Sequence, residues 1–298
     1  MRAFKYISIS DMNRDIRKNL SKIPRDIDFI IGVPRSGMLP ATIIAEFINV
    51  PLIDIDSFVN GNTPSIGGRK CLFKEPDQTK RVLVVDDTVC SGIAMSKAIA
   101  KIKASPRYNE YTFIYSCIYL EDERGRNLID LYLKDFMEYT KKDIQLLYEW
   151  NCFQHYPHIM NKMIFDIDGV LCTEEGRPHD SDEEGYKNYI ASVKPLFVPK
   201  VPINCILTYR LSKYEDITRE WLKKNGIKYN YLIMCNAPSW SERDRNIDSA
   251  TMKASFYKEH PEFILFVESD DYQARRICQL SGKQVLCVDS NKLYDNCS

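Results

Sequence analysis

Two apolar runs in this sequence each end in a pair of acids, and these acids are the residues best suited to carry chemistry. In RVLVVDDTVCSG, residues 81–92, Asp86 and Asp87 directly follow the apolar run, and small and polar residues come after them. Adjacent carboxylates suit the hydroxyls of a furanose, and the amides that open a following helix suit a phosphate. The stretch therefore predicts a site for ribose 5-phosphate.

The second run, MIFDIDGVLC, covers residues 163–172 and places Asp166 and Asp168 just past a buried strand. Side chains alternate along a strand, and Gly169 allows the chain to turn directly after the second acid. The two carboxylates are therefore expected to converge on one metal ion and one phosphate group.

The elements that must position these acids follow a strand-then-helix pattern in both halves of the chain. Strands are expected at residues 27–33, 51–56, 81–87, 111–120, 202–210, 231–235, 263–270 and 284–289, with another beginning at Met163. Helical spacing of apolar residues predicts helices over 39–48, 92–104 and 212–227, the last ended by Asn225–Gly226. Such alternation indicates an α/β fold with parallel sheets and helices on their faces. A boundary near residues 155–162 predicts two domains, 1–158 and 159–298.

Composition excludes several classes of protein. Lys+Arg and Asp+Glu both number 41 in the 298 residues, so no basic face for nucleic acid is indicated. The apolar runs are too short for a membrane span, and the first residues lack the apolar core of a signal peptide. The ten cysteines never fall as CxxC, and several lie in strand-like runs, which argues for a reducing compartment. We expect a cytoplasmic protein.

The first site has a recognisable sequence. LVVDDTVCSGIA, residues 83–94, resembles the phosphoribosyl-diphosphate loop of type I phosphoribosyltransferases, with Ser91 where threonine is commoner. GVPRSGMLP, residues 32–40, matches the loop of that family that binds diphosphate. The resemblance implies that Asp86 and Asp87 hold the ribose hydroxyls. It implies a 5-phosphate site at Thr88, Cys90, Ser91 and Gly92, and a diphosphate site with Mg²⁺ at Arg35, Ser36 and Gly37.

Two further segments are candidates for the first site. The family closes a mobile loop over its substrate, and the corresponding segment here contains Gly67, Gly68, Arg69 and Lys70. Arg69 and Lys70 are expected to clamp the diphosphate, with a solvated hairpin as the alternative. The acceptor is expected to bind under a hood formed by the N-terminal FKYISISDMNRDI and by LYEWNCFQHY, where Trp150 is either a stacking surface or a packing residue.

The second site also resembles a known superfamily. FDIDGVL is similar to the first motif of haloacid dehalogenase-type phosphatases, and the other motifs follow in order. Thr208 ends CILT as the second-motif hydroxyl, Lys253 stands in TMKASFYKE as the third-motif lysine, and FVESDD matches the acidic fourth motif. The resemblance implies a Rossmann-like domain, and the short spacing between the first two motifs predicts a minimal cap.

The resemblance assigns a role to each residue of the second site. Asp166 attacks phosphorus, and Asp168 protonates the leaving oxygen and then activates water. Thr208 and Lys253 steady the phosphoryl oxygens. Mg²⁺ is expected at Asp166, at Asp168 through its carbonyl, and at an acid of the fourth motif. The candidates for that acid are Glu268, Asp270 and Asp271, with Glu268 favoured and Asp270 next. Arg210 is either a substrate-binding residue or a surface arginine.

Together the two sites predict a bifunctional enzyme. The first would transfer 5-phosphoribosyl from phosphoribosyl diphosphate to a saccharide or lipid-linked glycan hydroxyl, and the second would hydrolyse the 5-phosphate to leave a ribofuranosyl residue. The arrangement resembles fused enzymes of bacterial ribofuranose polysaccharide assembly. Two alternatives stay open: a nucleobase salvage transferase with a nucleotidase domain, and a non-enzymatic sensor of phosphoribosyl diphosphate.

Overall fold

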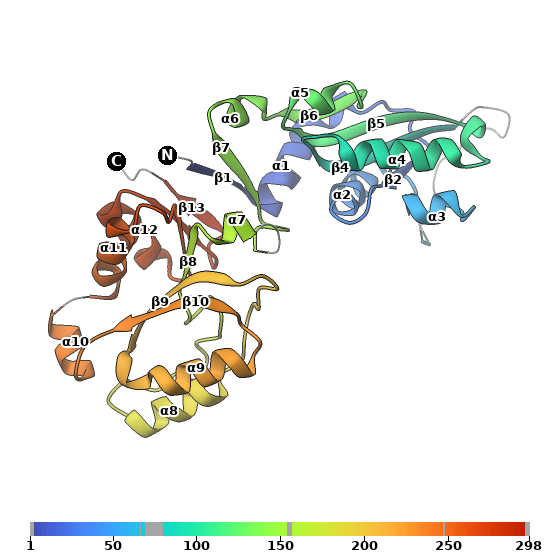
Figure 1. The fold of residues 1–298 in the computed structure, drawn as a ribbon. Coiled ribbons are helices and arrows are strands. Elements are labelled where there is room, and N and C mark those ends of the chain that lie inside the picture. Colours follow the sequence, from blue (N-terminus) through green and yellow to red (C-terminus); the bar gives the residue numbers. More distant parts are fainter. Residues whose placement is uncertain (1–2, 66, 69–79, 154–156, 247, 296–298) are drawn as a thin grey trace. The chain divides into compact units, whose positions relative to one another are not determined.

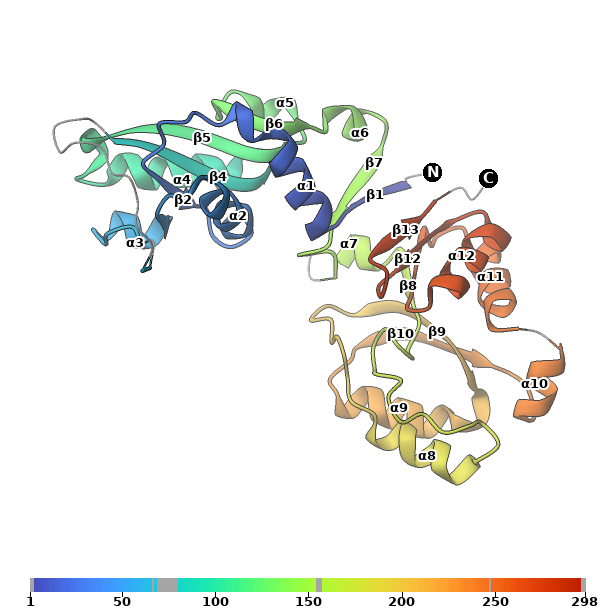
Figure 2. The same cartoon turned by 180° about the vertical axis from the view of Figure 1, so that it is seen from behind.

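The chain forms two compact units, and its first strand belongs with its second half. A computed structural model describes residues 3–65, 67–68, 80–153, 157–246 and 248–295. One unit, here the N-terminal unit, is Ile7–Leu146; the other, the C-terminal unit, is Met1–Tyr6 together with Leu147–Ser298. The chain passes between them in β1 (Ala3–Ile7) and β7 (Ile144–Tyr148), which pair with each other and can be followed in Figure 2.

This division differs from the predicted boundary after residue 158. Phe4, Tyr6, Leu147 and Cys152 are buried in the hydrophobic core of the C-terminal unit, so the segments expected to form the hood contribute to that core. The buried Gln284 side chain also accepts a hydrogen bond from the Phe4 amide at 2.6 Å and donates one to the Phe4 carbonyl at 2.8 Å.

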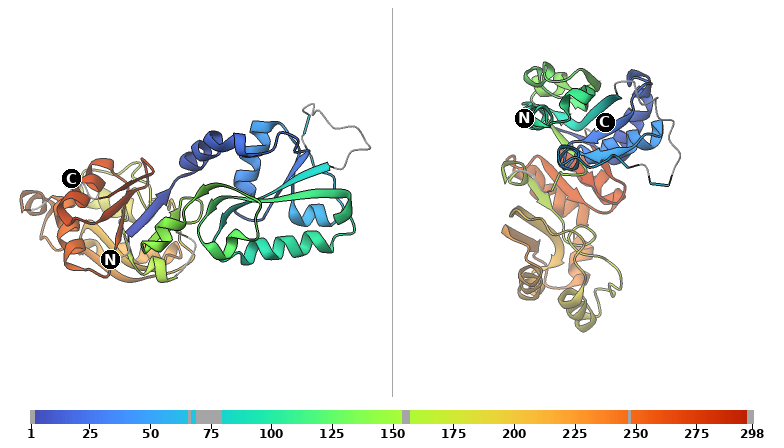
Figure 3. Two further views of the ribbon diagram at one scale, coloured as in Figure 1. Left: turned by 90° about the horizontal axis from the view of Figure 1, so that it is seen from above. Right: turned by 90° about the vertical axis from the view of Figure 1, so that its right-hand side faces the viewer.

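The N-terminal unit is built on a five-stranded parallel sheet in the order β3-β2-β4-β5-β6. Its strands are β2 (Phe29–Gly32), β3 (Leu52–Asp54), β4 (Lys80–Val89), β5 (Tyr111–Leu120) and β6 (Leu131–Asp135). Its helices are α1 (Ile9–Asn19), α2 (Met38–Ile48), α3 (Ile55–Val59), α4 (Ile93–Ala104), α5 (Glu123–Arg126) and α6 (Met137–Lys141). Helices α1 and α2 cover one face and α3 and α4 the other (Figures 1 and 3).

Burial explains which runs became central strands. Every residue of β2 is buried, as is the Val82–Asp87 part of β4, and strands buried on both faces read as continuous apolar runs. β3 is shorter than predicted, because the Asp54 side chain accepts a hydrogen bond from the Ser57 amide at 2.9 Å and caps α3. The chain therefore turns into a helix where the sequence suggested more strand.

The C-terminal unit contains a six-stranded sheet in the order β10-β9-β8-β11-β12-β13. The strands are β8 (Met163–Phe165), β9 (Ile203–Leu211), β10 (Tyr229–Cys235), β11 (Leu265–Glu268), β12 (Gln284–Cys287) and β13 (Lys292–Tyr294), all parallel except β13. The helices are α7 (Pro157–Met160), α8 (Glu183–Ser192), α9 (Glu215–Lys224), α10 (Trp240–Asn246), α11 (Ser249–Glu259) and α12 (Asp271–Ser281). The predicted α/β class with parallel sheets is confirmed.

Helices again cover both faces of this sheet. Figure 1 shows α8 and α9 side by side on one face and α11 and α12 side by side on the other. Helix α9 ends at Lys224, followed by Asn225 and by Gly226 with a φ of 70°, so the predicted helix end is confirmed. Between β8 and β9 the described chain forms only one helix, α8. None of the helices described is both long and apolar enough to span a membrane.

Candidate active sites

The first candidate site lies where the strand order of the N-terminal sheet reverses. From β2 the chain adds β3 on one side and then β4 on the other. In an open parallel sheet, ligands bind outside the carboxyl ends of the strands at such a reversal. The loop after β2 contains Arg35, Ser36 and Gly37, and the end of β4 contains Asp86 and Asp87, so both predicted motifs meet at this edge.

The sequence suggested that Asp86 and Asp87 end their strand, but the strand continues to Val89. β2 stops at the pair Gly32–Val85, whereas β4 continues along β5 to the pair Val89–Leu120. The two acids therefore lie just beyond the end of the shorter neighbour β2. Both are buried, and the Asp86 side chain accepts a hydrogen bond from the Asp87 amide at 2.9 Å.

The loop after β2 packs tightly onto β4. A Cβ atom added to the buried Gly37 would lie 2.6 Å from the Val33 oxygen, 2.7 Å from the Val85 oxygen and 2.9 Å from the Asp86 Cα. All three atoms belong to the backbone, so only glycine allows this approach. Arg35 is exposed and Ser36 half-buried, so their side chains remain accessible beside the acids.

The predicted phosphate loop leads from β4 into α4. Cys90 and Ser91 are exposed and Thr88 is half-buried, while Gly92 is buried and has a φ of 75°. Helix α4 has no side-chain cap at Gly92 among the described residues, and Ile93 at its start is 61% exposed. The first amides of α4 are therefore oriented as an anion site requires.

The electrostatics of the acid pair are unusual. Burial, and then the charge of Asp87, raise the pKa of Asp86 to about 8. The surroundings of Asp86 therefore favour its protonated form near neutral pH. A ligand that offers hydroxyl donors would offset the cost of ionising this side chain.

This pKa predicts a pH-dependent effect of Asp86→Asn on stability. Asp86 keeps its proton to about pH 8 in the folded chain, but an unfolded chain loses it near the ordinary value of 3.8. The folded state thus binds more protons between these values, and Asp86 lowers the free energy of unfolding progressively as pH rises. Urea unfolding should show Asp86→Asn to be more stable than wild type, by a margin at least about 1 kcal/mol larger at pH 8 than at pH 5. Equal margins at both pH values, or an equal effect of Asp56→Asn, which changes an exposed acid on helix α3, would contradict the assignment.

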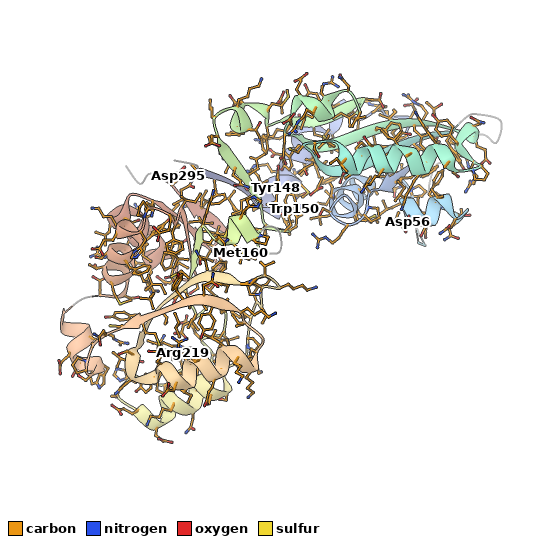
Figure 4. All side chains as sticks on the ribbon, in the orientation of Figure 1. Asp56, Tyr148, Trp150, Met160, Arg219 and Asp295 are labelled. Atoms are coloured by element: carbon orange, nitrogen blue, oxygen red, sulfur yellow. The ribbon has the colours of Figure 1, made fainter. Side chains whose placement is uncertain are left out.

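The described structure does not place the remaining candidates of the first site beside Asp86 and Asp87. Arg69 and Lys70 lie outside the described residues, and Gly67 and Gly68 are exposed. Trp150 belongs to the C-terminal unit, where its ring lies 4.8 Å from that of Tyr148 (Figure 4). This contact favours the packing interpretation of Trp150.

The second candidate site lies at the corresponding reversal in the other sheet. β8 is central, with β9 on one side and β11 on the other. Asp166 and Asp168 follow β8, Thr208 and Arg210 lie on β9, and Glu268 ends β11. These five residues line one cavity of about 250 Å³, together with Lys253 from α11 and Asp270, which caps α12. The predicted residues of all four motifs are therefore brought together.

Lys253 joins two acids of the cavity. Its ammonium lies 2.6 Å from an Asp166 oxygen and 2.7 Å from a Glu268 oxygen, and all three side chains are almost fully buried. The other Glu268 oxygen accepts a hydrogen bond from the Ser269 amide at 2.9 Å. Burial, with the charges of Glu268 and Asp168, raises the pKa of Asp166 to about 7, against the opposing effect of Lys253.

Arg210 forms a buried ion pair with Asp168. Its Nε and Nη2 atoms donate to the two Asp168 oxygens at 3.0 and 2.6 Å. Although burial opposes ionisation, the Arg210 charge and hydrogen bonds lower the pKa of Asp168 to about 2. Arg210 is 1% exposed, so the surface-arginine alternative is wrong. Its Nη1 atom is buried without a partner among the described residues, which leaves one donor for a bound group.

The oxygen atoms of this cavity fit Mg²⁺ in kind. The Asp166 carboxylate, the Asp168 carbonyl and the carboxylates of Glu268 and Asp270 are hard oxygen donors of the sort that Mg²⁺ prefers. Ser269, directly after β11, contacts the turn after β8, because its hydroxyl donates to the Asp168 carbonyl at 3.2 Å. No group of three or more His, Cys, Asp or Glu side chains arranged to hold a metal is found in the described part of the chain. Lys253 and Arg210 form ion pairs with the inner carboxylates Asp166, Glu268 and Asp168.

Several residues of this cavity were missed by the sequence analysis. Glu174 and Arg177 come a few residues after Asp168, and Arg243 comes from α10. Tyr209 lies between the predicted residues Thr208 and Arg210 on β9. Glu174 and Arg177 carried a weak signal, since charged residues close after a candidate nucleophile tend to share its cavity. Arg243 carried none, because nothing in the sequence relates α10 to β8.

Comparisons with known proteins agree with the first site. Residues 6–106 match the family model described as a phosphoribosyl transferase domain, so this part of the chain is a type I phosphoribosyltransferase domain. Xanthine-guanine phosphoribosyltransferase of Chromohalobacter salexigens is 27% identical over 146 residues, which cover 49% of this chain and 82% of that protein.

Two solved structures are also similar to this chain. Xanthine-guanine-hypoxanthine phosphoribosyltransferase of Helicobacter pylori is 15% identical, with a TM-score of 0.34, covering 49% of this chain and 94% of that one. Orotate phosphoribosyltransferase of Aeropyrum pernix is 19% identical, with a TM-score of 0.29, and the match covers 47% of this chain and 68% of that one.

Proposed function

We propose that the chain is a bifunctional enzyme that adds a ribofuranosyl residue to a glycan. The N-terminal unit transfers 5-phosphoribosyl from phosphoribosyl diphosphate to a saccharide or lipid-linked glycan hydroxyl, and the C-terminal unit hydrolyses the 5-phosphate. The observation that carries this proposal is the convergence of Asp166, Thr208 and Lys253 on one cavity in a chain that also has a phosphoribosyltransferase domain. Removal of the phosphate would turn a transferred phosphopentose into a plain sugar residue.

The residues of the first site suit the transfer step. Asp86 and Asp87 accept hydrogen bonds from the ribose hydroxyls, and the loop from Thr88 to Gly92 binds the 5-phosphate. The loop at Arg35–Gly37 holds the leaving diphosphate. The acceptor oxygen bonds to the anomeric carbon as the diphosphate departs, with inversion. Fixed charges and dipoles at the developing charges supply much of the acceleration in such reactions.

The residues of the second site suit a two-step hydrolysis. The Asp166 carboxylate attacks phosphorus as the bond from phosphorus to the sugar oxygen breaks, which forms an aspartyl phosphate. The departing sugar oxygen takes a proton from Asp168 or from water, and a water molecule then hydrolyses the aspartyl phosphate. Arg210 keeps Asp168 ionised, which suits the second of its two expected roles, accepting a proton from that water, and disfavours the first, protonating the leaving oxygen. Lys253, already bonded to Asp166, neutralises phosphoryl oxygens. Mg²⁺, held by Asp166, the Asp168 carbonyl and Glu268 or Asp270, would supply charge neutralisation between nucleophile and substrate.

Mass spectrometry tests the complete proposal. Candidate acceptor oligosaccharides are incubated with the protein, phosphoribosyl diphosphate and Mg²⁺ and followed over time. We expect a phosphopentose adduct first and then its conversion to a pentose adduct. If phosphoribosyl diphosphate is consumed but every saccharide stays unmodified, the glycan acceptor is wrong.

A second candidate is a nucleobase acceptor, which the similarity to xanthine-guanine phosphoribosyltransferase favours. The second unit would then hydrolyse the nucleotide to a nucleoside. Incubation with phosphoribosyl diphosphate and each common base distinguishes the two proposals. Rapid formation of a nucleotide would replace the glycan proposal by this one.

A further inference from the structure

We propose that Glu174, Arg177 and Arg243 bind the hydroxyls of the pentose whose phosphate is removed, with Asp180 holding the two arginines in place. These four residues are called the mouth group below. The inference rests on the proposed phosphatase and adds how that site recognises its leaving group.

The size of the cavity limits what enters it. Its volume of about 250 Å³ is below the roughly 300–1,000 Å³ of pockets that enclose drug-sized ligands. Asp166, Lys253 and Glu268 occupy the buried inner part, where the phosphate must lie for attack. A terminal phosphopentose therefore fills the cavity, with its ring beside the mouth group and the rest of the glycan outside.

The mouth group offers donors and acceptors without net charge. Arg177 contacts Glu174 and Asp180, each at 3.4 Å, and Arg243 also pairs with Asp180. Both Arg177 contacts are longer than the 2.7–2.9 Å usual for charged hydrogen bonds, so hydroxyl oxygens can compete for its donors. Two acids balance two arginines, which favours a neutral polyhydroxylated group over a second anion.

The same geometry disfavours a nucleobase at the mouth. Tyr209 is the aromatic side chain that lines the cavity, and the Arg243 guanidinium lies 4.3 Å from its ring centroid. Arg243 also donates to the Tyr209 carbonyl at 3.3 Å, which fixes it over the ring. A base would have to displace this cation in order to stack.

Neighbouring residues of the wall provide a matched control. Glu174 and Arg177 line this cavity, whereas Glu175 and Gly176 line a separate cavity of about 540 Å³. Glu174 and Glu175 are both exposed acids and adjacent in sequence, but each lines a different cavity. Glu174→Gln and Glu175→Gln therefore remove the same charge and differ in the cavity that they affect and in the contact of Glu174 with Arg177.

The test compares two phosphomonoesters in the full-length protein. Methyl β-D-ribofuranoside 5-phosphate carries ring hydroxyls, and phenyl phosphate carries none. Losing a hydrogen bond to a charged group should lower the ratio of kcat/KM for the sugar phosphate to that for phenyl phosphate by about 10-fold in Glu174→Gln. Arg177→Gln should lower the ratio similarly, and Glu175→Gln should leave it within about twofold of wild type.

The outcomes separate this inference from the proposal beneath it. A lowered ratio in Glu174→Gln and Arg177→Gln alone supports it. Equal losses on both substrates, an unchanged ratio, or an equal effect of Glu175→Gln refutes recognition by the mouth group while the phosphatase stands. If wild type releases phosphate from neither ester, the phosphatase and this inference both fail.

Discussion

Asp166→Asn is expected to lower phosphate release by at least about 10⁴-fold while leaving pentosyl transfer within about threefold of wild type. An amide of nearly the same size cannot attack phosphorus as a carboxylate does. Lys253 keeps Glu268 at 2.7 Å as a partner, so the cavity should stay assembled. With phosphoribosyl diphosphate and a competent acceptor, this variant should therefore accumulate the phosphopentose adduct, seen by mass spectrometry.

The control for this prediction is Asp216→Asn, which makes the same change at an exposed acid in the first turn of α9. It should release phosphate at the wild-type rate. Phosphate release by Asp166→Asn at an undiminished rate would remove Asp166 as the nucleophile.

The second large effect is expected from changing Asp86 and Asp87 together to asparagine. The ribose hydroxyls would lose both carboxylate acceptors, and transfer should fall by at least about 10³-fold. Hydrolysis of a supplied 5-phosphoribosyl product should stay within about threefold, because that reaction belongs to the other unit. Product formation in each half-reaction, measured separately, gives the two rates.

The substitution at Asp86 should not unfold the protein, since Asp86 is a buried acid whose raised pKa opposes stability at neutral pH. Asp56→Asn on α3, where the acid is exposed, serves as the matched substitution with intact transfer expected. Transfer that survives in the double variant would exclude these acids from the pentose site.

The sequence predicted the central strands well, although β4 continues past Asp86 and Asp87 to Val89. Runs such as IIG and LVV are apolar because strands covered on both faces have no polar side, and this signal is local. The convergence of Asp166, Thr208, Lys253 and Glu268 followed from motifs whose order along the chain was recognisable. The expected phosphoribosyltransferase domain is likewise supported by the family match over residues 6–106.

Long-range relations could not be predicted in the same way. The ion pair of Arg210 with Asp168 joins β9 to the turn after β8, and nothing in the sequence pairs these two candidates with each other. Arg243 reaches the cavity from α10, which carries no pattern linking it to the motifs. The sequence places β1 in the expected hood, because the contact of Phe4 with Gln284 joins residues that are 280 positions apart and leaves no local pattern.

The contacts of Phe4 with Gln284 also bear on how the chain is made. During synthesis, residues 7–146 can form their own core as soon as they emerge, and β1 can pair with β7 at that stage, but the contacts of Phe4 with Gln284 form only when β12 has appeared. The strand Ala3–Ile7 thus completes its native contacts only after most of the C-terminal unit has been made. A protein cut between the units would keep its amino-terminal strand with the later half, and residues 159–298 produced alone would lack it.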